Sequence, residues 1–153
     1  MERKTPGGTV LPPETFAGED IPYNRFVKIG ADEKTYLKCG ANEHAVGVVE
    51  NDLLSHNIDD TERTGFKRYD PLAIKNSGAA ILEAGEAIEL EELIKPGANG
   101  VAMKYTISTV SDPPTQAQVQ AIARQDRDIR GIVVKNPAGK AGDLVKVILL
   151  NMG

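Results

Sequence analysis

The sequence lacks tryptophan, contains one cysteine and two histidines, and has only 5% aromatic residues. A single cysteine, Cys39, excludes an intrachain disulfide framework and any zinc site built from several cysteines. Because Cys39 closes a short strand-like run, a buried, inert thiol is the favoured interpretation over a reactive one. The sequence therefore predicts a protein without covalent cross-links or a cysteine-based metal centre.

Long apolar runs are missing too, and no stretch approaches the roughly 20 residues that cross a membrane. The N-terminus leads into proline and glycine without the apolar segment of a signal peptide. The formal net charge of -4 gives no reason to expect nucleic acid or an anionic membrane as partner. With 153 residues, we expect one soluble domain, made in the cytoplasm.

Motifs that carry chemistry are also scarce. His44 and His56 stand in no nucleophile–base or metal-ligand spacing, and the glycines form no phosphate-binding loop. The tetrapeptide that ends at Lys104, Val-Ala-Met-Lys, is similar to the modified-lysine motif of biotinyl domains, but Lys104 falls in a strand-like run, not a turn. We therefore predict no enzyme, no cofactor and no metal.

Two acidic stretches are candidate sites. Residues 57–62 bring several side-chain oxygens together but fail the EF-hand pattern, which leaves a weak surface cation site open. The second stretch is typical of a solvated face rather than of an acid–base pair. It comprises Glu83, Glu86, Glu89, Glu91 and Glu92.

What the sequence does have is glycine (15) and proline (9), which favour short strands joined by tight turns. Residues 1–22 are rich in both, so we predict an extended N-terminal arm rather than a helix or a central strand. The arm carries large apolar side chains that a solvated linker rarely has, which indicates docking on a neighbour. The residues assigned to docking are Val10, Leu11, Pro12, Pro13 and Phe16.

We predict that residues 23–153 form a single domain that is mainly β, a small β-barrel or sheet with one short helix. Alternating or β-branched runs predict its strands. The run at 87–91 fits a strand but also one face of a helix, so both alternatives stay open there. The final run is nearly all aliphatic, so we expect it to be covered on both faces. The predicted strands are 23–30, 35–39, 45–50, 71–76, 79–85, 87–91, 101–110, 129–134 and 144–150.

Two segments interrupt this pattern. Residues 51–69 are polar and predict a long surface excursion. Thr115 and Gln118 have the spacing of a capping box, so we predict a short helix over 115–127. A glycine within each of the runs at 45–50 and 129–134 indicates a bend or a close backbone approach at two equivalent places of a curved sheet.

The order of these runs resembles the head decoration (capsid cement) proteins of tailed bacteriophages, over about residues 23–151. The residues that carry the resemblance include Ala-Val-Gly-Val-Val at 45–49, Ile-Arg-Gly-Ile-Val-Val at 129–134 and the closing Ala-Gly-Asp with its aliphatic strand at 141–150. The resemblance implies a small β-barrel or β-tulip-like fold, a homotrimer, and the major capsid protein as partner. It also implies a location on the exterior of the virion capsid, where the protein stabilises contacts between capsomers.

Two other function classes remain open at this point. A small β-barrel hydrolase or lyase would need His44, His56 and several carboxylates to converge in one pocket. A ligand- or carbohydrate-binding barrel would need an exposed aromatic platform, and the sequence has only three Phe and four Tyr to build one.

Overall fold

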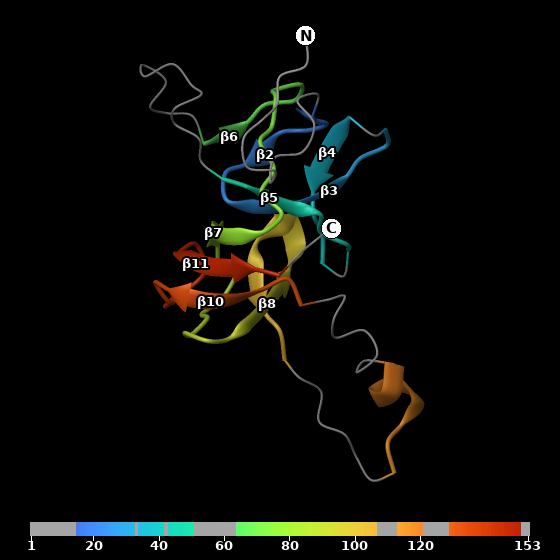
Figure 1. Cartoon of the computed structure of the whole chain (residues 1–153), viewed down its shortest axis with the longest axis vertical. Helices are drawn as coiled ribbons and strands as arrows, with labels where there is room; N and C mark the ends of the chain where they lie inside the picture. Colours follow the sequence, from blue (N-terminus) through green and yellow to red (C-terminus); the bar gives the residue numbers. More distant parts are fainter. Residues whose placement is uncertain are drawn as a thin grey trace.

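In the computed structural model, the described residues are 15–32, 34–41, 43–50, 64–106, 113–120 and 129–150. They form a mainly β domain, as the sequence predicts, with one short helical stretch at 116–120. Figure 1 shows two sheets one above the other, with the helical stretch apart from both. Among the described residues, no helix has the length and apolar character to cross a membrane.

The first sheet has four strands in the order β1-β4-β3-β5. The β1 strand pairs with β4 in parallel, and the other neighbours are antiparallel. A separate two-stranded pair, β2-β6, lies in the same upper half of Figure 1. The strands are β1 (Phe16–Ala17), β2 (Ile21–Pro22), β3 (Arg25–Ile29), β4 (Thr35–Lys38), β5 (Gly47–Val49) and β6 (Gly65–Phe66).

The second sheet has five antiparallel strands in the order β7-β11-β10-β8-β9. Ala84, directly after β7, forms a parallel bridge with Ala102 of β9, so the sheet curls round until its two edges meet. We call this sheet the barrel. Its elements are β7 (Gly78–Glu83), β8 (Leu93–Pro96), the 3₁₀ turn η1 (Ala98–Gly100), β9 (Ala102–Lys104), β10 (Gly131–Lys135) and β11 (Leu144–Leu149).

The four-stranded sheet separates two hydrophobic cores. Successive side chains of a strand point to opposite faces. On β3, Phe26 therefore joins the core inside the barrel, while Val27 joins the core shared with β2 and β6. Val48 and Val49 of β5 divide in the same way. All four side chains are fully buried, so this sheet is covered on both faces.

The folded domain includes residues before Tyr23, the predicted boundary between arm and domain. Residues 15–22 belong to the folded domain, because Ala17 and Ile21 are fully buried and Thr15 Oγ1 donates a hydrogen bond to the Leu72 carbonyl at 2.7 Å. Proline had excluded a central strand here, and the two strands formed, β1 and β2, are only two residues long. Residues 1–14 lie outside the described part of the chain.

The two interrupting segments are described in part. Of the polar excursion predicted over 51–69, residues 51–63 lie outside the described part, while Phe66 is buried in β6. Of the helix predicted over 115–127, residues 116–120 are helical, and residues 121–127 lie outside the described part of the chain. The capping box is confirmed: the Thr115 amide donates to Gln118 Oε1 at 2.9 Å, and the Gln118 amide to Thr115 Oγ1 at 3.2 Å.

Some strand predictions were wrong. The run at 87–91 is neither strand nor helix: Ile88 makes one bridge to Ala138, and the strand, β8, begins only at Leu93. Of the run predicted over 101–110, residues Ala102–Lys104 form β9 and residues 105–106 are not strand, while 107–110 lie outside the described part of the chain. Residues 71–76 make only single bridges, at Pro71 and Lys75.

Candidate functional site

The final strand, β11, is open to solvent on one side, contrary to the expectation that both faces would be covered. Val145, Val147 and Leu149 point into the barrel and are buried, whereas Leu144 and Ile148 point outward and are 49% and 40% exposed. The exposed aliphatic side chains make this side of the strand a candidate contact surface. We call the outward side of β7, β10 and β11 the outer barrel face.

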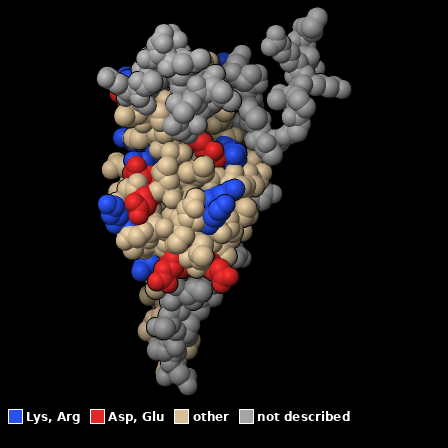
Figure 2. Space-filling model, turned by 90° about the vertical axis from the view of Figure 1, so that its left-hand side faces the viewer, with Lys and Arg blue, Asp and Glu red and all other residues tan. Residues whose placement is uncertain are grey.

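Charged side chains of both signs are interspersed over the side of the molecule shown in Figure 2. They surround an uncharged area and do not gather by sign. A nucleic-acid surface collects positive charge on one face or along one groove, and this side of the described structure does not. That nucleic acid is not a partner stays a prediction for the whole chain.

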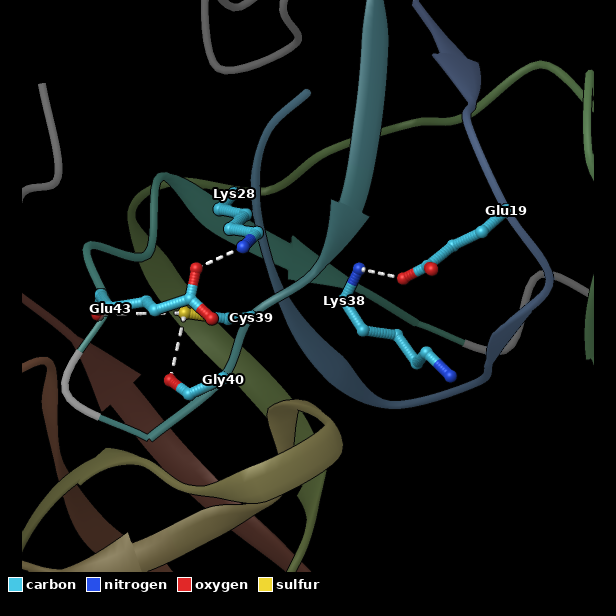
Figure 3. Close-up of polar contacts among 6 residues, drawn as sticks. All are labelled: Glu19, Lys28, Lys38, Cys39, Gly40 and Glu43. Carbon is cyan, nitrogen blue, oxygen red and sulfur yellow. Dashed lines mark hydrogen bonds and ion pairs between the residues drawn. The ribbon is translucent and has the colours of Figure 1, made fainter. Parts of the chain in front are cut away.

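A charged hollow of about 340 Å³ lies beside β3 and β4. Figure 3 shows its ion pair, in which the Lys28 ammonium donates to the Glu43 carboxylate above the Cys39 thiol. On the other side of the hollow, the Lys38 amide donates to Glu19 Oε1 at 2.9 Å. Its lining residues are Glu19, Lys28, Leu37, Lys38, Cys39, Gly40, Glu43 and Asn99.

The electrostatics of this hollow keep its thiol inert. Burial, together with the negative charge of Glu43, raises the pKa of Cys39 to about 11. The thiol donates to the carbonyls of Gly40 and Glu43 at 3.6 Å each, which holds its proton in place. The hydrogen bond from Lys28 to Glu43 raises the pKa of Lys28, so its ammonium stays charged. Cys39 is therefore protonated near neutral pH and is not an activated nucleophile.

His44 contacts a buried arginine. Nη2 of Arg130 lies 2.8 Å from Nδ1 of His44, and Arg130 is only 6% exposed. Because a guanidinium can only donate, Nδ1 of His44 is the acceptor in this contact. This contact joins the loop that carries His44 to Arg130, the residue directly before β10.

The enzyme hypothesis required His44, His56 and several carboxylates to converge. His56 lies outside the described residues, and among those described no three His, Cys, Asp or Glu side chains form a group that could hold a metal ion. The stretch at 57–62 that was left open as a cation site is also outside them. That the protein is not an enzyme and binds no metal or cofactor stays a prediction.

The predicted docking residues fall mostly outside the described structure. Val10, Leu11, Pro12 and Pro13 belong to residues 1–14, about which the structure says nothing. Phe16 is described, and it lies in β1 with its side chain partly buried. Its backbone contacts both Thr35 of β4 and Pro71, so Phe16 belongs to the fold whatever else it binds.

No protein-family model and no curated protein matches the chain. Its structure is similar to that of the N base of head fiber gp8.5 in bacteriophage phi29, with a TM-score of 0.57 and 14% sequence identity. The likeness covers 89% of this chain and 90% of that one. The two chains share a fold. Membership of the head decoration family, which the sequence resembles, stays a prediction.

Proposed function

We propose that the chain is a structural protein of a tailed-phage head that binds the exterior of the capsid. The observation that carries the proposal is the fold shared with a head-fibre base along nearly the whole of both chains. The resemblance of residues 23–151 to capsid cement proteins supports the same location independently. Two lines of comparison, one from sequence order and one from structure, therefore lead to the phage head.

In this role the protein stabilises contacts between capsomers of the major capsid protein and acts as a homotrimer. Cementing requires no catalysis, because modest contacts repeated over a symmetric lattice add up to a large stabilisation. The inert Cys39 thiol is compatible with such a role. The binding energy would come from apolar docking surfaces, of which the outer barrel face is one.

The N-terminal arm supplies the capsid contact. Val10 and Leu11 provide apolar contact area, and Pro12 and Pro13 hold the backbone extended, so that less conformational freedom is lost on binding. Phe16 marks the point at which the arm enters the folded domain. An arm of this kind binds by lying along a neighbour's surface or by adding a strand to its sheet.

The test is co-sedimentation with expanded capsids that were assembled without this protein. A deletion must stop at residue 14, because Thr15 and Ala17 are built into the fold. We expect the full chain to saturate the capsids and the chain lacking residues 1–14 to bind at least roughly tenfold more weakly. A Val10→Ser/Leu11→Ser double variant should follow the deletion, and Ile29→Ser, at a 56% exposed site on β3, should bind like the unaltered chain.

Failure of the full chain to bind would overturn the proposed function. Equal binding by the full and the shortened chain would overturn only the role of the arm. The variants thereby separate the capsid partner from the segment that holds it.

A further inference from the structure

An exposed aromatic side chain stands in the turn that follows β6. Tyr69 is 67% exposed, the largest value among the large hydrophobic side chains of the described residues. Cζ of the neighbouring Arg68 lies 4.9 Å from the centre of the Tyr69 ring, so the guanidinium covers one face of that ring. Tyrosine and arginine are enriched among the side chains that dominate the binding energy of protein interfaces. We call residues 67–70 the tyrosine turn.

The backbone of Tyr69 has an unusual conformation, with a φ of 72°. In this left-handed region the Cβ of an L residue crowds the following carbonyl oxygen, so glycine enters it freely and asparagine more often than most residues. Five described residues other than glycine have a positive φ, and three of them are asparagines. A residue as bulky as tyrosine is an outlier there, and its conformation costs free energy that the rest of the fold must offset.

Hydrogen bonds hold the tyrosine turn in this conformation. The Asp70 amide donates to the Lys67 carbonyl at 2.9 Å, and the Lys67 amide donates to Asp70 Oδ2 at 2.8 Å. These two bonds close a β-turn in which Tyr69 occupies the third position, where a positive φ favours glycine or asparagine. The Tyr69 amide donates to the carbonyl of Ala17 in β1 at 2.7 Å. The turn is therefore held both by its own residues and by the four-stranded sheet.

The fold needs the backbone of this turn but not the tyrosine ring. The hydrogen bonds that hold Tyr69 use only its amide, and its side chain belongs to neither hydrophobic core. A glycine could form the same turn without the crowding at Cβ. An exposed ring that is kept at a strained position indicates a role outside the fold, since strain of this kind concentrates at functional sites.

The tyrosine turn lies beside the point at which the N-terminal arm enters the domain. Ala17 exchanges two backbone hydrogen bonds with the turn: its amide donates to the Asp70 carbonyl at 2.9 Å, and its carbonyl accepts from the Tyr69 amide. Thr15, two residues earlier, is the first described residue of the chain. Leu11 precedes Thr15 by four residues, a span of at most about 14 Å. A partner that holds the arm therefore lies within reach of the Tyr69 ring.

We propose that the tyrosine turn is a second anchor on the capsid, in which the Tyr69 ring enters an apolar pocket of the major capsid protein and the Arg68 guanidinium faces an acidic side chain at the rim of that pocket. This inference rests on the proposed function and names a further contact of the same interface. The partner is the capsid protein because the turn adjoins the root of the arm, the segment proposed to hold the capsid. A turn already fixed by hydrogen bonds loses little conformational freedom on docking.

Co-sedimentation with capsids that lack this protein, combined with thermal unfolding, tests the anchor. Tyr69→Gly removes the ring and relieves the backbone, so capsid binding should weaken roughly tenfold or more, while Tm stays unchanged or rises by up to about 3 °C. Tyr69→Phe keeps the ring and should bind within about threefold of the unaltered chain, and Arg68→Gln should bind roughly threefold to fivefold more weakly. Loss of binding without loss of Tm separates an anchor from a part of the fold.

The matched control is Asn99→Gly, which also places glycine at an exposed position of positive φ, in this case 60°. Because asparagine already tolerates this conformation, the control should change neither Tm nor capsid binding.

Hydroxyl-radical footprinting of the unaltered chain provides a second, independent measurement. Tyr69 should be oxidised readily in the free protein, because its side chain is 67% exposed. On the capsid its oxidation should slow roughly fivefold or more, since the centre of an interface excludes water.

Equal capsid binding by Tyr69→Gly and the unaltered chain would overturn the anchor, and so would equal oxidation of Tyr69 on and off the capsid. A fall in Tm of more than about 3 °C for Tyr69→Gly would assign the ring to the fold instead. The pocket would also be overturned if Tyr69→Phe or Asn99→Gly bound as weakly as Tyr69→Gly. Failure of the full chain to bind capsids would overturn the proposed function and this inference with it, whereas full binding without the ring would overturn the anchor alone.

Discussion

The four-stranded sheet and the barrel use aliphatic residues differently. On β3 and β5, neighbouring side chains enter two different cores, so Phe26 and Val27 of β3, like Val48 and Val49 of β5, are all buried. On β11, alternate side chains enter the barrel, and the others, equally aliphatic, face outward. The four-stranded sheet therefore has a core on each face, whereas the barrel sheet has a core on its inner face and exposed aliphatic side chains on its outer face.

The two cores also differ in composition. The core around β2 and β6 contains Tyr23, Tyr36 and Phe66, with the rings of Tyr23 and Phe66 packed edge-to-face at 5.1 Å. Among the described residues, the core inside the barrel contains one aromatic side chain, Phe26, which enters from β3. The described core of the barrel is therefore mainly aliphatic, with one large aromatic side chain supplied by the other sheet.

The largest expected effect should follow the removal of the Phe26 side chain from the barrel core. Phe26→Ala should lower the free energy of unfolding by about 3–5 kcal/mol, because Phe26 is fully buried and its loss leaves a cavity. Phe16→Ala, at the partly buried position in β1, should cost roughly 1–2 kcal/mol. Urea unfolding of both variants measures the difference. Equal losses of stability would contradict the claim that Phe26 fills the core of the barrel.

The next prediction concerns the ion pair that links the two sheets. Arg25 of β3 donates to Glu83 of β7 at 2.6 Å, with side chains only 12% and 32% exposed. A double-mutant cycle with Arg25→Met and Glu83→Gln should give a coupling energy of about 1.5–3 kcal/mol. The pair between Lys75 and Glu50, at 42% and 28% exposure, should give less than about 1 kcal/mol.

If the two cycles gave the same coupling, burial at the junction of the sheets would not strengthen the Arg25–Glu83 pair. Both cycles are measured by urea unfolding at one salt concentration, because screening affects the more exposed pair more.

A smaller effect should appear at alkaline pH. The pKa of Cys39 is raised from 9.0 to about 11, so between these values the unfolded chain loses a proton that the folded chain keeps. The contribution of Cys39 is therefore neutral below pH 9, and stability falls as the pH rises through this window. The raised pKa of Lys28 acts in the same direction at higher pH.

Unfolding measured at pH 8 and pH 10.5 should show a smaller loss for Cys39→Ala than for the unaltered chain. In the unaltered chain at pH 7.5, iodoacetamide should modify Cys39 far more slowly in the folded than in the unfolded state. Rapid modification of the folded protein would mean that the thiol is neither buried nor protonated.

The smallest effect should be local to the helical stretch. Thr115→Ala removes the hydroxyl that accepts from the Gln118 amide, which costs the helix about 1 kcal/mol. Residues 113–117 are exposed, so global unfolding should change by less than about 0.5 kcal/mol. Hydrogen exchange of the Gln118 amide should accelerate; an unchanged rate would mean that the capping box does not protect this turn.

Local chemistry made part of the fold predictable. The capping box at Thr115 and Gln118 needs only residues close in sequence, and it was predicted correctly. The strands around Phe26, Tyr36 and Val133 also follow from local alternation or β-branched runs. Gly47 and Gly131 were correctly assigned to close approaches, since a Cβ on either would stand 2.9 Å from a backbone oxygen, that of Lys75 or Ile148. The prediction that they occupy equivalent places of one sheet was wrong, because Gly47 lies in the four-stranded sheet and Gly131 in the five-stranded one.

Other features depend on distant contacts that a local pattern does not contain. The β1 strand forms because residues far along the chain, at 35 and 71, lie on either side of Phe16. The aliphatic run of β11 gives no indication of which face is covered, because both of its faces are apolar. The acidic stretch from Glu83 to Glu92 was assigned to a solvated face, and Glu89 and Glu91 are indeed exposed. Its local pattern does not show the backbone hydrogen bonds of Ile88 and Glu91 to residues far along the chain.

The most direct test of the whole account is electron microscopy of capsids that lack this protein, before and after the protein is added. The account predicts ordered density on the capsid exterior, at the junctions between capsomers, with three-fold symmetry. Capsids that remain bare at saturating protein concentration, or density on the inner surface, would contradict it.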